Sequence, residues 1–320
     1  MRKLKVGLAG LGVMGKHHLR ILSQLDGVDL VAVYDIESRS IPTSSDTKFV
    51  SSLDELFKSD IDYCVVSAPT STHFEIGLQL ASYGIHALIE KPITTTAIEA
   101  HKLIDAFAKK NLIGGVGHVE RFNPAIKAMR EKIAEGLLGD VFQIATRRQG
   151  PFPARISDVG VVKDLATHDI DLTMWVMQDD YESISSQTGH RSGRQNEDLL
   201  VAVGKLKSGV IVNHLVNWMS PFKERNVTVI GSNGALVADT LTSDLTFFEN
   251  GTQADSWVGI ATFRGVSEGT ATRFSLNKIE PLLAEHLAFR DAVRNRETSG
   301  IVTFQQGLNT LEIADRLLTL

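Results

Sequence analysis

The sequence predicts an α/β fold with two domains: a doubly wound parallel sheet of the Rossmann type, then an open, mostly antiparallel sheet with helices on one face. Short apolar strands alternate with helical segments as far as residue 118, which is typical of a parallel sheet. From residue 121 onward, the pattern changes to a helix and then to short strands joined by turns. A chain of 320 residues is longer than a domain with a single hydrophobic core usually is, so we predict two domains, at residues 1–120 and 121–320.

The composition is that of an ordinary globular protein and argues against several classes of partner. Hydrophobic residues make up 43% of the chain and charged residues 22%. The net charge of −5 and the lack of a long basic run argue against nucleic acid and anionic membranes. Apolar runs are too short for a spanning helix or a signal peptide. The single cysteine, Cys64, lies in an apolar strand, so we expect no internal disulfide and a reducing cytoplasm.

A dinucleotide-binding turn is predicted near the N-terminus. An apolar strand at residues 5–9 runs into a Gly-x-Gly-x-x-Gly turn, and a helix is expected from residue 16 to 25. The first glycine permits a tight turn, the second lets the backbone approach a pyrophosphate, and the third lets the helix pack on the strand. The helix N-terminus offers N–H groups to phosphates. The expected cofactor contacts here are Gly10, Gly12, Val13, Met14 and Gly15.

The cofactor preference is predicted by the next strand, at residues 29–34. It ends in Asp35, twenty residues past Gly15, where a carboxylate accepts hydrogen bonds from a ribose and repels a 2′-phosphate. We therefore expect NAD as the cofactor. Arg39, four residues further on, keeps NADP open.

Further strands are expected at residues 48–50, 62–67, 86–90 and 112–118, with helices between them. Ligands of doubly wound sheets lie outside the carboxyl ends of the strands. The residues at or just past such ends are Gly10, Asp35, Pro69, His73, Lys91 and His118. Additional cofactor contacts are expected from Ala68, Pro69, Thr70, His73, Glu90, Lys91 and Pro92. For His73, lining of the nicotinamide pocket and capping of a helix both stay open.

The second domain is expected to begin with a helix at residues 125–135 and a strand at 142–147. An amphipathic helix is predicted within residues 162–177, and two helices at 281–296 and 304–318 end the chain. Between them, alternation predicts strands at 199–206, 210–218, 226–230, 235–239 and 244–248. We expect Trp175 and Trp218 in the core or on a sheet face.

Asp164 and His168 stand four residues apart, so they are expected on one face of the helix within residues 162–177. Asp169 and Asp171 are interpreted as solvated or capping residues. His17 and His18, early in the first helix, are expected at the surface.

Three motifs, in this order, resemble one family. They are Gly10-Leu11-Gly12-x-x-Gly15, Glu90-Lys91-Pro92 and Asp164-x-x-x-His168. Together they look like the glucose–fructose oxidoreductase / inositol dehydrogenase / MocA family, over the whole chain. The segments 117–124 and 150–162 resemble the branch that oxidises the 3-hydroxyl of UDP-N-acetylglucosamine or a related UDP-sugar. That branch often has an apolar residue where this chain has Lys163.

The resemblance implies a sugar or nucleotide-sugar dehydrogenase in which Lys91, His168 and Asp164 do the chemistry. We favour His168 as the proton acceptor, because an unperturbed histidine titrates near ~6.5, and Lys91 as the cation that stabilises the alkoxide. Substrate contacts are expected from Lys91, Asp164, His168, Asn123 and Arg155. For Arg155 and for Arg148, both a contact to the substrate and a solvated position in the loop stay open. No metal is expected. The resemblance also implies a cis Lys91–Pro92 bond and a homodimer or homotetramer.

Three other classes of dehydrogenase fit the sequence less well. The short-chain dehydrogenases need Tyr-x-x-x-Lys, which is missing, and zinc alcohol dehydrogenases need more than one cysteine. The β-hydroxyacid dehydrogenases need an all-helical second domain, against the strands predicted here. Two alternatives stay open: an inositol or free-sugar dehydrogenase, and a regulator that binds a dinucleotide without turnover.

Overall fold

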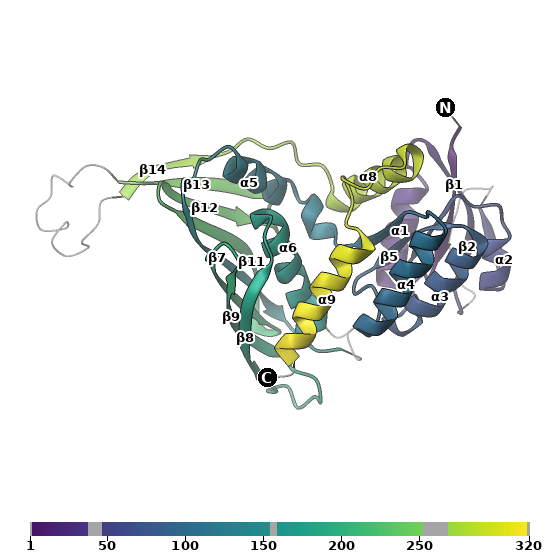
Figure 1. The fold of residues 1–320 in the computed structure, drawn as a ribbon, viewed down its shortest axis with the longest axis horizontal. Coiled ribbons are helices and arrows are strands. Elements are labelled where there is room, and N and C mark those ends of the chain that lie inside the picture. Colours follow the sequence, from purple (N-terminus) through teal and green to yellow (C-terminus); the bar gives the residue numbers. More distant parts are fainter. Residues whose placement is uncertain (1, 38–46, 154–158, 252–267, 319–320) are drawn as a thin grey trace, which may run out of the picture. The chain divides into compact units, whose positions relative to one another are not determined.

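The computed structural model describes residues 2–37, 47–153, 159–251 and 268–318 (Figure 1). Arg39 and Arg155 lie outside the described residues. The chain divides into two compact units. The first comprises Met1–Val119 and Glu280–Glu312, and the second comprises Glu120–Ile279 and Ile313–Leu320. The predicted division at residue 120 assigned residues 280–312 to the second domain, whereas in the structure they belong to the first unit.

The first unit is built on a six-stranded sheet in which every pair of neighbouring strands is parallel. Its strands are β1 (Leu4–Ala9), β2 (Val28–Tyr34), β3 (Lys48–Val50), β4 (Tyr63–Val66), β5 (His86–Glu90) and β6 (Gly114–Gly117). The order β3-β2-β1-β4-β5-β6 is that of a doubly wound Rossmann sheet, whose strand order reverses between β1 and β4. The predicted fold class is confirmed for this unit.

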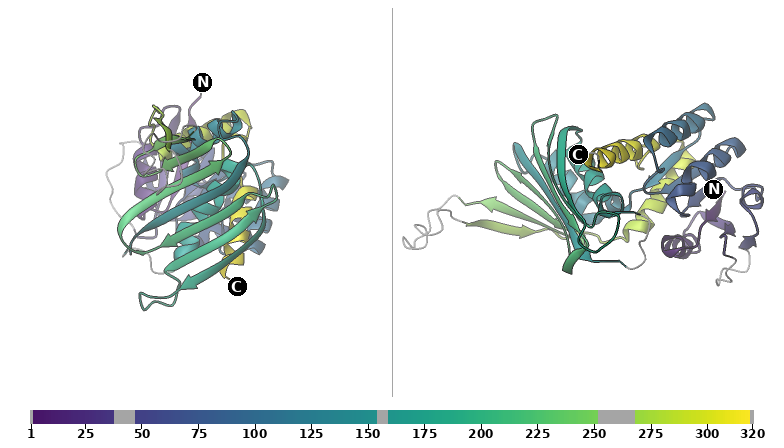
Figure 2. Two further views of the ribbon diagram at one scale, coloured as in Figure 1. Left: turned by 90° about the vertical axis from the view of Figure 1, so that its left-hand side faces the viewer. Right: turned by 90° about the horizontal axis from the view of Figure 1, so that it is seen from below.

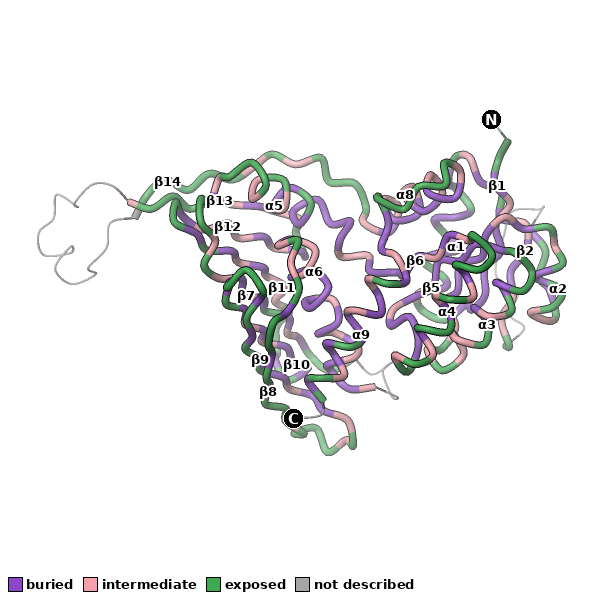
Figure 3. Tube along the Cα trace, in the orientation of Figure 1, coloured by how far each residue is buried: buried purple, intermediate pink, exposed green. Residues whose placement is uncertain are grey.

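Helices cover both faces of this sheet. They are α1 (Val13–Leu22), α2 (Leu53–Phe57), α3 (Thr70–Tyr83), α4 (Ala97–Lys109), α8 (Pro281–Asn295) and the first part of α9 (Phe304–Leu318). Leu19 of α1 and Phe289 of α8 share a core with Leu88 of β5. Ile89, the next residue, points to the opposite face, where α3 and α4 pack. The strands are consequently buried along most of their length (Figure 3).

Local signals for helix ends agree with the structure. The hydroxyl of Ser52 accepts a hydrogen bond from the Glu55 N–H at 3.1 Å and caps α2. Thr96 and Glu99 form a reciprocal capping box at the start of α4. Gly84 ends α3 in the left-handed region, at φ 76°.

The second unit contains an eight-stranded sheet in the order β14-β13-β12-β11-β7-β10-β9-β8 (Figure 2). Its strands are β7 (Val141–Pro151), β8 (Tyr181–Gly189), β9 (Leu199–Leu206), β10 (Ile211–Asn217), β11 (Met219–Gly231), β12 (Gly234–Asp239), β13 (Asp244–Asn250) and β14 (Glu268–Arg273). The β7–β10 pair is parallel and the other pairs are antiparallel. The predicted mostly antiparallel sheet is thus confirmed.

One face of this second sheet is covered by α5 (Pro124–Ala134) and α6 (Thr167–Met177) (Figure 1). Before them come two short turns of helix, at Val119–Phe122 and Val162–Ala166. Met129, Ile170 and Trp218 are buried in the core between helices and sheet. Along β9 the side chains alternate, so that Leu200 is buried whereas Val201 and Val203 on the outer face are 43% and 54% exposed.

A buried histidine joins three strands of the second sheet and makes the stability of the protein pH-dependent. Nδ1 of His214 lies 2.7 Å from the Thr146 hydroxyl, and Nε2 lies 2.7 Å from the Tyr181 hydroxyl. Burial lowers the pKa of His214 to about 4, from an ordinary value of 6.5. The unfolded chain therefore binds a proton at this residue at a pH where the folded protein does not. The contribution of the neutral His214 to the free energy of unfolding is fully present above pH 6.5 and is lost as the pH falls toward 4.

We expect the His214→Gln variant, whose amide can pair with the same hydroxyls, to lose less stability on acidification. Between pH 7 and pH 5, the free energy of unfolding of the parent should fall by about 2 kcal/mol more than that of the variant. Urea denaturation at both pH values measures this. Equal losses in the two proteins would show that His214 does not titrate as its burial requires.

Cys64 is fully buried in β4, as expected. None of the helices in the described part of the chain is long and apolar enough to cross a bilayer.

Candidate active site

The glycine turn between β1 and α1 is shaped by close approaches of the backbone. Gly10 has a φ of 96°, and a Cβ there would lie 2.6 Å from the Ala68 nitrogen. A Cβ on Gly15 would lie 2.1 Å from the Gly10 carbonyl oxygen. Gly12, by contrast, is exposed at the N-cap of α1, and a Cβ there would meet no protein atom within 4 Å. The space over Gly12 is therefore open for a ligand, and the N–H groups of the first turn of α1 face it without a side-chain cap.

Gly12 and Gly15 provide a matched pair of variants. We expect Gly15→Ala to destabilise the first unit by about 3 kcal/mol, because its methyl group overlaps the Gly10 carbonyl. We expect Gly12→Ala to keep its melting temperature but to bind NADH at least about tenfold more weakly, because the methyl group fills the space for the pyrophosphate. Thermal unfolding and NADH fluorescence titration measure the two effects. Unchanged NADH binding by Gly12→Ala would mean that the pyrophosphate does not lie at this turn.

Asp35 lies at the carboxyl end of β2, beside the glycine turn. One carboxylate oxygen accepts a hydrogen bond from the Leu11 N–H at 2.6 Å, and the other accepts one from the Glu37 N–H at 2.9 Å. Each carboxylate oxygen has a further lone pair for a hydroxyl donor. The residues of this edge thus fit an adenosine ribose and a pyrophosphate.

His73 connects the loops that follow β4 and β5. Its side chain is buried in the first turn of α3, with Nε2 2.9 Å from the Ala68 carbonyl oxygen and Nδ1 3.0 Å from the Pro92 carbonyl oxygen. Burial lowers the pKa of His73, although both carbonyl contacts oppose the shift. The helix cap that the sequence left open is not formed, since Pro69 is the N-cap of α3 (Thr70–Tyr83) and no side chain caps this helix.

The Glu90-Lys91-Pro92 segment ends β5, and its Lys91–Pro92 bond is cis, as predicted. Lys91 is half-buried. The Lys91 N–H donates to the Glu90 carboxylate at 3.1 Å. Burial would raise the pKa of Glu90, but the hydrogen bond from His18 and the charges of His18 and Lys91 outweigh it, so the pKa of Glu90 lies below its usual value. A carboxylate that stays ionised therefore sits directly before the lysine.

His18 was predicted at the surface, and this prediction is wrong. Its side chain is fully buried and lies 2.9 Å from the Glu90 carboxylate, whereas its neighbour His17 is exposed. The spacing of Gly15, His18, Leu19 and Leu22, which are all buried on α1, is the pattern of one helix face and was visible in the sequence.

In the second unit, Asp164 and His168 lie on either side of a change in helix type. Val162–Ala166 forms a π-helical turn, in which the Thr167 N–H donates to the Val162 carbonyl, and α6 begins at Thr167. Such turns often occur at functional sites. Asp164 is buried and His168 is half-buried.

Glu197 supports the π-helical turn from a distant part of the chain. One of its carboxylate oxygens accepts the Val162 N–H at 3.0 Å, and its backbone carbonyl accepts the Val161 N–H at 2.9 Å. A Cβ on Gly160 would overlap this carboxylate, at 2.0 Å. No local sequence signal pointed to Glu197, because its role depends on a contact across 35 residues.

Asp169 and Asp171 are buried, so their interpretation as solvated or capping residues is wrong. Arg148, also buried, lies 3.1 Å from Asp169 and 2.9 Å from Glu120. Asp171 accepts two hydrogen bonds from Arg121, at 2.6 and 2.7 Å. Burial raises the pKa of Asp169 to about 6, against the opposing charge of Arg148. These ion pairs fasten α6 to its surroundings and account for Arg148 as part of the fold.

Asn123 also has a structural role. Its side-chain oxygen accepts the Ala125 N–H and caps α5, and its amide nitrogen donates to the Thr240 carbonyl at 2.9 Å. The side chain is 3% exposed. A substrate contact by Asn123 stays a prediction.

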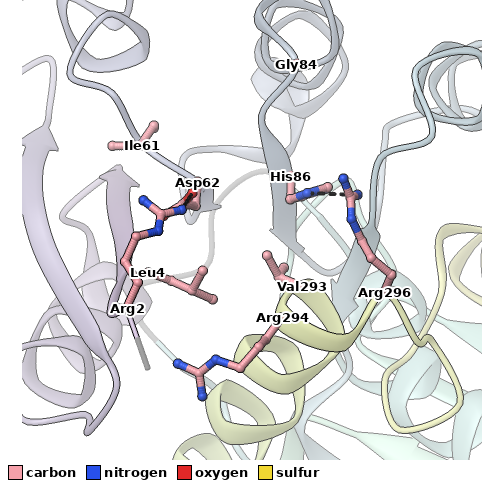
Figure 4. Close-up of a pocket in the computed structure, with 9 residues that line it drawn as sticks. All are labelled: Arg2, Leu4, Ile61, Asp62, Gly84, His86, Val293, Arg294 and Arg296. Atoms are coloured by element: carbon pink, nitrogen blue, oxygen red, sulfur yellow. Dashed lines mark hydrogen bonds and ion pairs between the residues drawn. The ribbon is translucent and has the colours of Figure 1, made fainter.

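A cavity of about 510 Å³ opens at the opposite edge of the first sheet (Figure 4). It lies at the amino ends of β1 and β5, and in its wall Nε2 of His86 lies 3.1 Å from the guanidinium of Arg296. Its lining residues are Arg2, Leu4, Ile61, Asp62, Gly84, His86, Val293, Arg294 and Arg296. The glycine turn, Asp35 and Lys91 are at the carboxyl ends of the strands, so this cavity is not the dinucleotide site.

Comparison with known families accounts for both units. A model of the oxidoreductase family with an NAD-binding Rossmann fold matches residues 4–118. A model of the GFO/IDH/MocA C-terminal domain matches residues 126–237. The chain belongs to the GFO/IDH/MocA family of oxidoreductases. Its first unit is the family's NAD-binding Rossmann domain, and the expected cofactor, NAD, is confirmed at this level.

Individual GFO/IDH/MocA proteins resemble this chain over most of its length. UDP-N-acetylglucosamine 3-dehydrogenase of Acidithiobacillus ferrooxidans is 27% identical over 311 residues, or 92% of this chain and 94% of that protein. Myo-inositol 2-dehydrogenase of Thermotoga maritima is 25% identical over 74% of this chain and 76% of that protein. A solved structure of the A. ferrooxidans enzyme has a TM-score of 0.85, covering 99% of this chain and 97% of that one. At 22% identity, that structural likeness establishes the fold.

Proposed function

We propose that this oxidoreductase transfers a hydride between NAD and a secondary alcohol of a nucleotide sugar, most specifically the 3-hydroxyl of a UDP-N-acetylhexosamine. The main support for this reaction is the position of Lys91. This half-buried lysine lies at the carboxyl end of β5, in the unit that contains the dinucleotide turn. The choice of sugar is supported by the relative that matches 92% of the chain.

The cofactor is proposed to lie along the carboxyl edge of the first sheet. The residues proposed to hold it are Gly10, Gly12, Val13, Met14, Gly15, Asp35, Ala68, Pro69, Thr70, His73, Glu90, Lys91 and Pro92. NAD, when bound, accepts the hydride. The carboxylate of Asp35 favours an unmodified ribose, because it would repel a 2′-phosphate.

The protein must take the proton of the hydroxyl and stabilise the oxygen as its charge develops. We assign the proton to His168 and the stabilising positive charge to Lys91. Asp164, four residues before His168, is proposed to act with it. Arg155 and Asn123 stay predicted substrate contacts.

Two other functions can be separated from this one. The alternative of an inositol or free-sugar dehydrogenase has support from the 25% identity to a myo-inositol 2-dehydrogenase. A regulator without turnover is disfavoured by the presence of Lys91, Asp164 and His168 together.

The test is NADH absorbance with purified protein and UDP-N-acetylglucosamine, myo-inositol or glucose, each with NAD and with NADP. We expect the absorbance to rise only with the UDP-sugar and NAD. A rise with inositol or glucose would support a dehydrogenase but contradict the proposed substrate. No rise with any sugar, in a protein that still binds NADH by fluorescence, would favour the regulator.

We propose that the protein forms a homodimer or homotetramer through the outer face of the eight-stranded sheet. Val201, Val203 and Ile211 expose 43%, 54% and 45% of their area there. Light scattering at micromolar concentration should give a multiple of the chain mass, and Val203→Asp should reduce it. A monomeric mass for the parent protein would contradict this proposal. A reducing cytoplasm, expected from Cys64, stays a prediction.

A further inference from the structure

A buried chain of hydrogen bonds within the first unit leads to the residue before Lys91. Nε2 of His286, on α8, lies 2.9 Å from Nδ1 of His18, on α1. Nε2 of His18 lies 2.9 Å from one oxygen of Glu90, whose other oxygen accepts the Lys91 N–H at 3.1 Å. Both histidines are fully buried, and Glu90 is 9% exposed. The chain therefore joins α8, α1 and the end of β5.

The contacts restrict where the protons of this chain of hydrogen bonds lie. The pKa of Glu90 is low, so its carboxylate only accepts, and Nε2 of His18 must donate to it. Burial lowers the pKa of His286 well below its ordinary value, so that ring is neutral and has one N–H to give. The contact between His18 Nδ1 and His286 Nε2 is a single hydrogen bond, whose donor is the ring that carries the proton at this contact. Each link then has one donor and one acceptor.

We propose that His18 and His286 are positioning residues for Lys91: they hold the Glu90 carboxylate in place, which fixes the Lys91 N–H and keeps a negative charge close to the lysine. This inference deepens the proposed function and rests on its assignment of a role to Lys91. His18 also stands on the helix that begins at the dinucleotide turn. One side chain thus connects that helix to the lysine strand.

Three variants separate this role from general stability. His18→Leu removes the donor to Glu90, whereas His18→Gln keeps one donor and one acceptor at similar reach. His86→Leu is the matched control, because His86 is also a buried histidine of the first unit but lies at the other end of β5. His86 hydrogen-bonds to the Ile113 N–H at 2.8 Å, so its loss should also destabilise the unit.

The first readout needs no substrate. Acetic anhydride at mildly alkaline pH acetylates unprotonated lysines, and peptide mass spectrometry gives the rate at Lys91 relative to the exposed Lys102. We expect Lys91 to be acetylated about three- to tenfold faster in His18→Leu and in Glu90→Gln, because the ammonium loses a fixed opposite charge. His18→Gln and His86→Leu should keep the parent rate. An unchanged rate in His18→Leu, or an equal rise in His86→Leu, would overturn the inference.

The second readout is turnover with NAD and UDP-N-acetylglucosamine. His18→Leu should lower kcat about tenfold or more, with the KM for NAD changed less than about twofold, and His18→Gln should restore most of kcat. A kcat that falls equally in His86→Leu would overturn the positioning role. If the parent turns over none of the sugars while the acetylation rates change as expected, the proposed substrate fails and the positioning role of His18 stands.

Discussion

The Lys91→Met variant is expected to lose about a thousandfold or more in kcat and to keep its affinity for NADH within about threefold. Methionine preserves the length and apolar stem of lysine but removes the cation that stabilises the developing alkoxide, a contribution made in the transition state. Initial rates with NAD and UDP-N-acetylglucosamine measure kcat, and fluorescence titration measures NADH binding.

The matched control is Lys102→Met, which removes an exposed lysine on α4 of the same unit and should leave both quantities unchanged. A Lys91→Met protein with more than about a tenth of the parent kcat would remove Lys91 from the proposed chemistry.

The His168→Ala variant is expected to lower kcat by about a hundred- to a thousandfold, because the reaction loses its proton acceptor. A base must be neutral to accept a proton, so kcat of the parent should fall toward acid pH. That fall should disappear in the variant, and added imidazole should restore part of kcat. His190→Ala, at an exposed histidine of the same unit, is the control. An unchanged pH profile in His168→Ala would assign the proton to another group.

Much of the fold followed from local patterns in the sequence. The strand at residues 199–206 was predicted with its observed bounds, because apolar and β-branched residues make up most of it and the turn residue Gly209 follows it. The last two helices were predicted to within one residue. The first helix begins at Val13 instead of residue 16, since Gly12 already serves as its N-cap.

The parts that the sequence did not predict depend on contacts between distant residues. Asp169 and Asp171 look like surface carboxylates until Arg148 and Arg121 are brought to them. The π-helical turn at Val162–Ala166 depends on Glu197, and the return of α8 to the first sheet depends on Phe289 and its neighbours. For the same reason His286, 268 residues from His18, gave no signal of its own.

The sequence predicted the residues of the candidate site better than it predicted the buried residues that hold them in place. The glycine turn, Asp35, Lys91 and the cis bond before Pro92 all stand at the carboxyl edge where the doubly wound pattern places them. The chain of His286, His18 and Glu90 next to that edge required the structure, although the buried spacing of α1 already included His18.

The proposed reaction is hydride transfer from a defined carbon of a nucleotide sugar. The most direct measurement uses UDP-N-acetylglucosamine carrying deuterium at carbon 3, incubated with the protein and NAD, followed by mass spectrometry of the reduced cofactor. The proposed function predicts NADH that is heavier by one deuterium and a slower rate than with unlabelled sugar. Unlabelled NADH would place the oxidation at another carbon, and no NADH in a protein that binds the cofactor would contradict the proposed substrate.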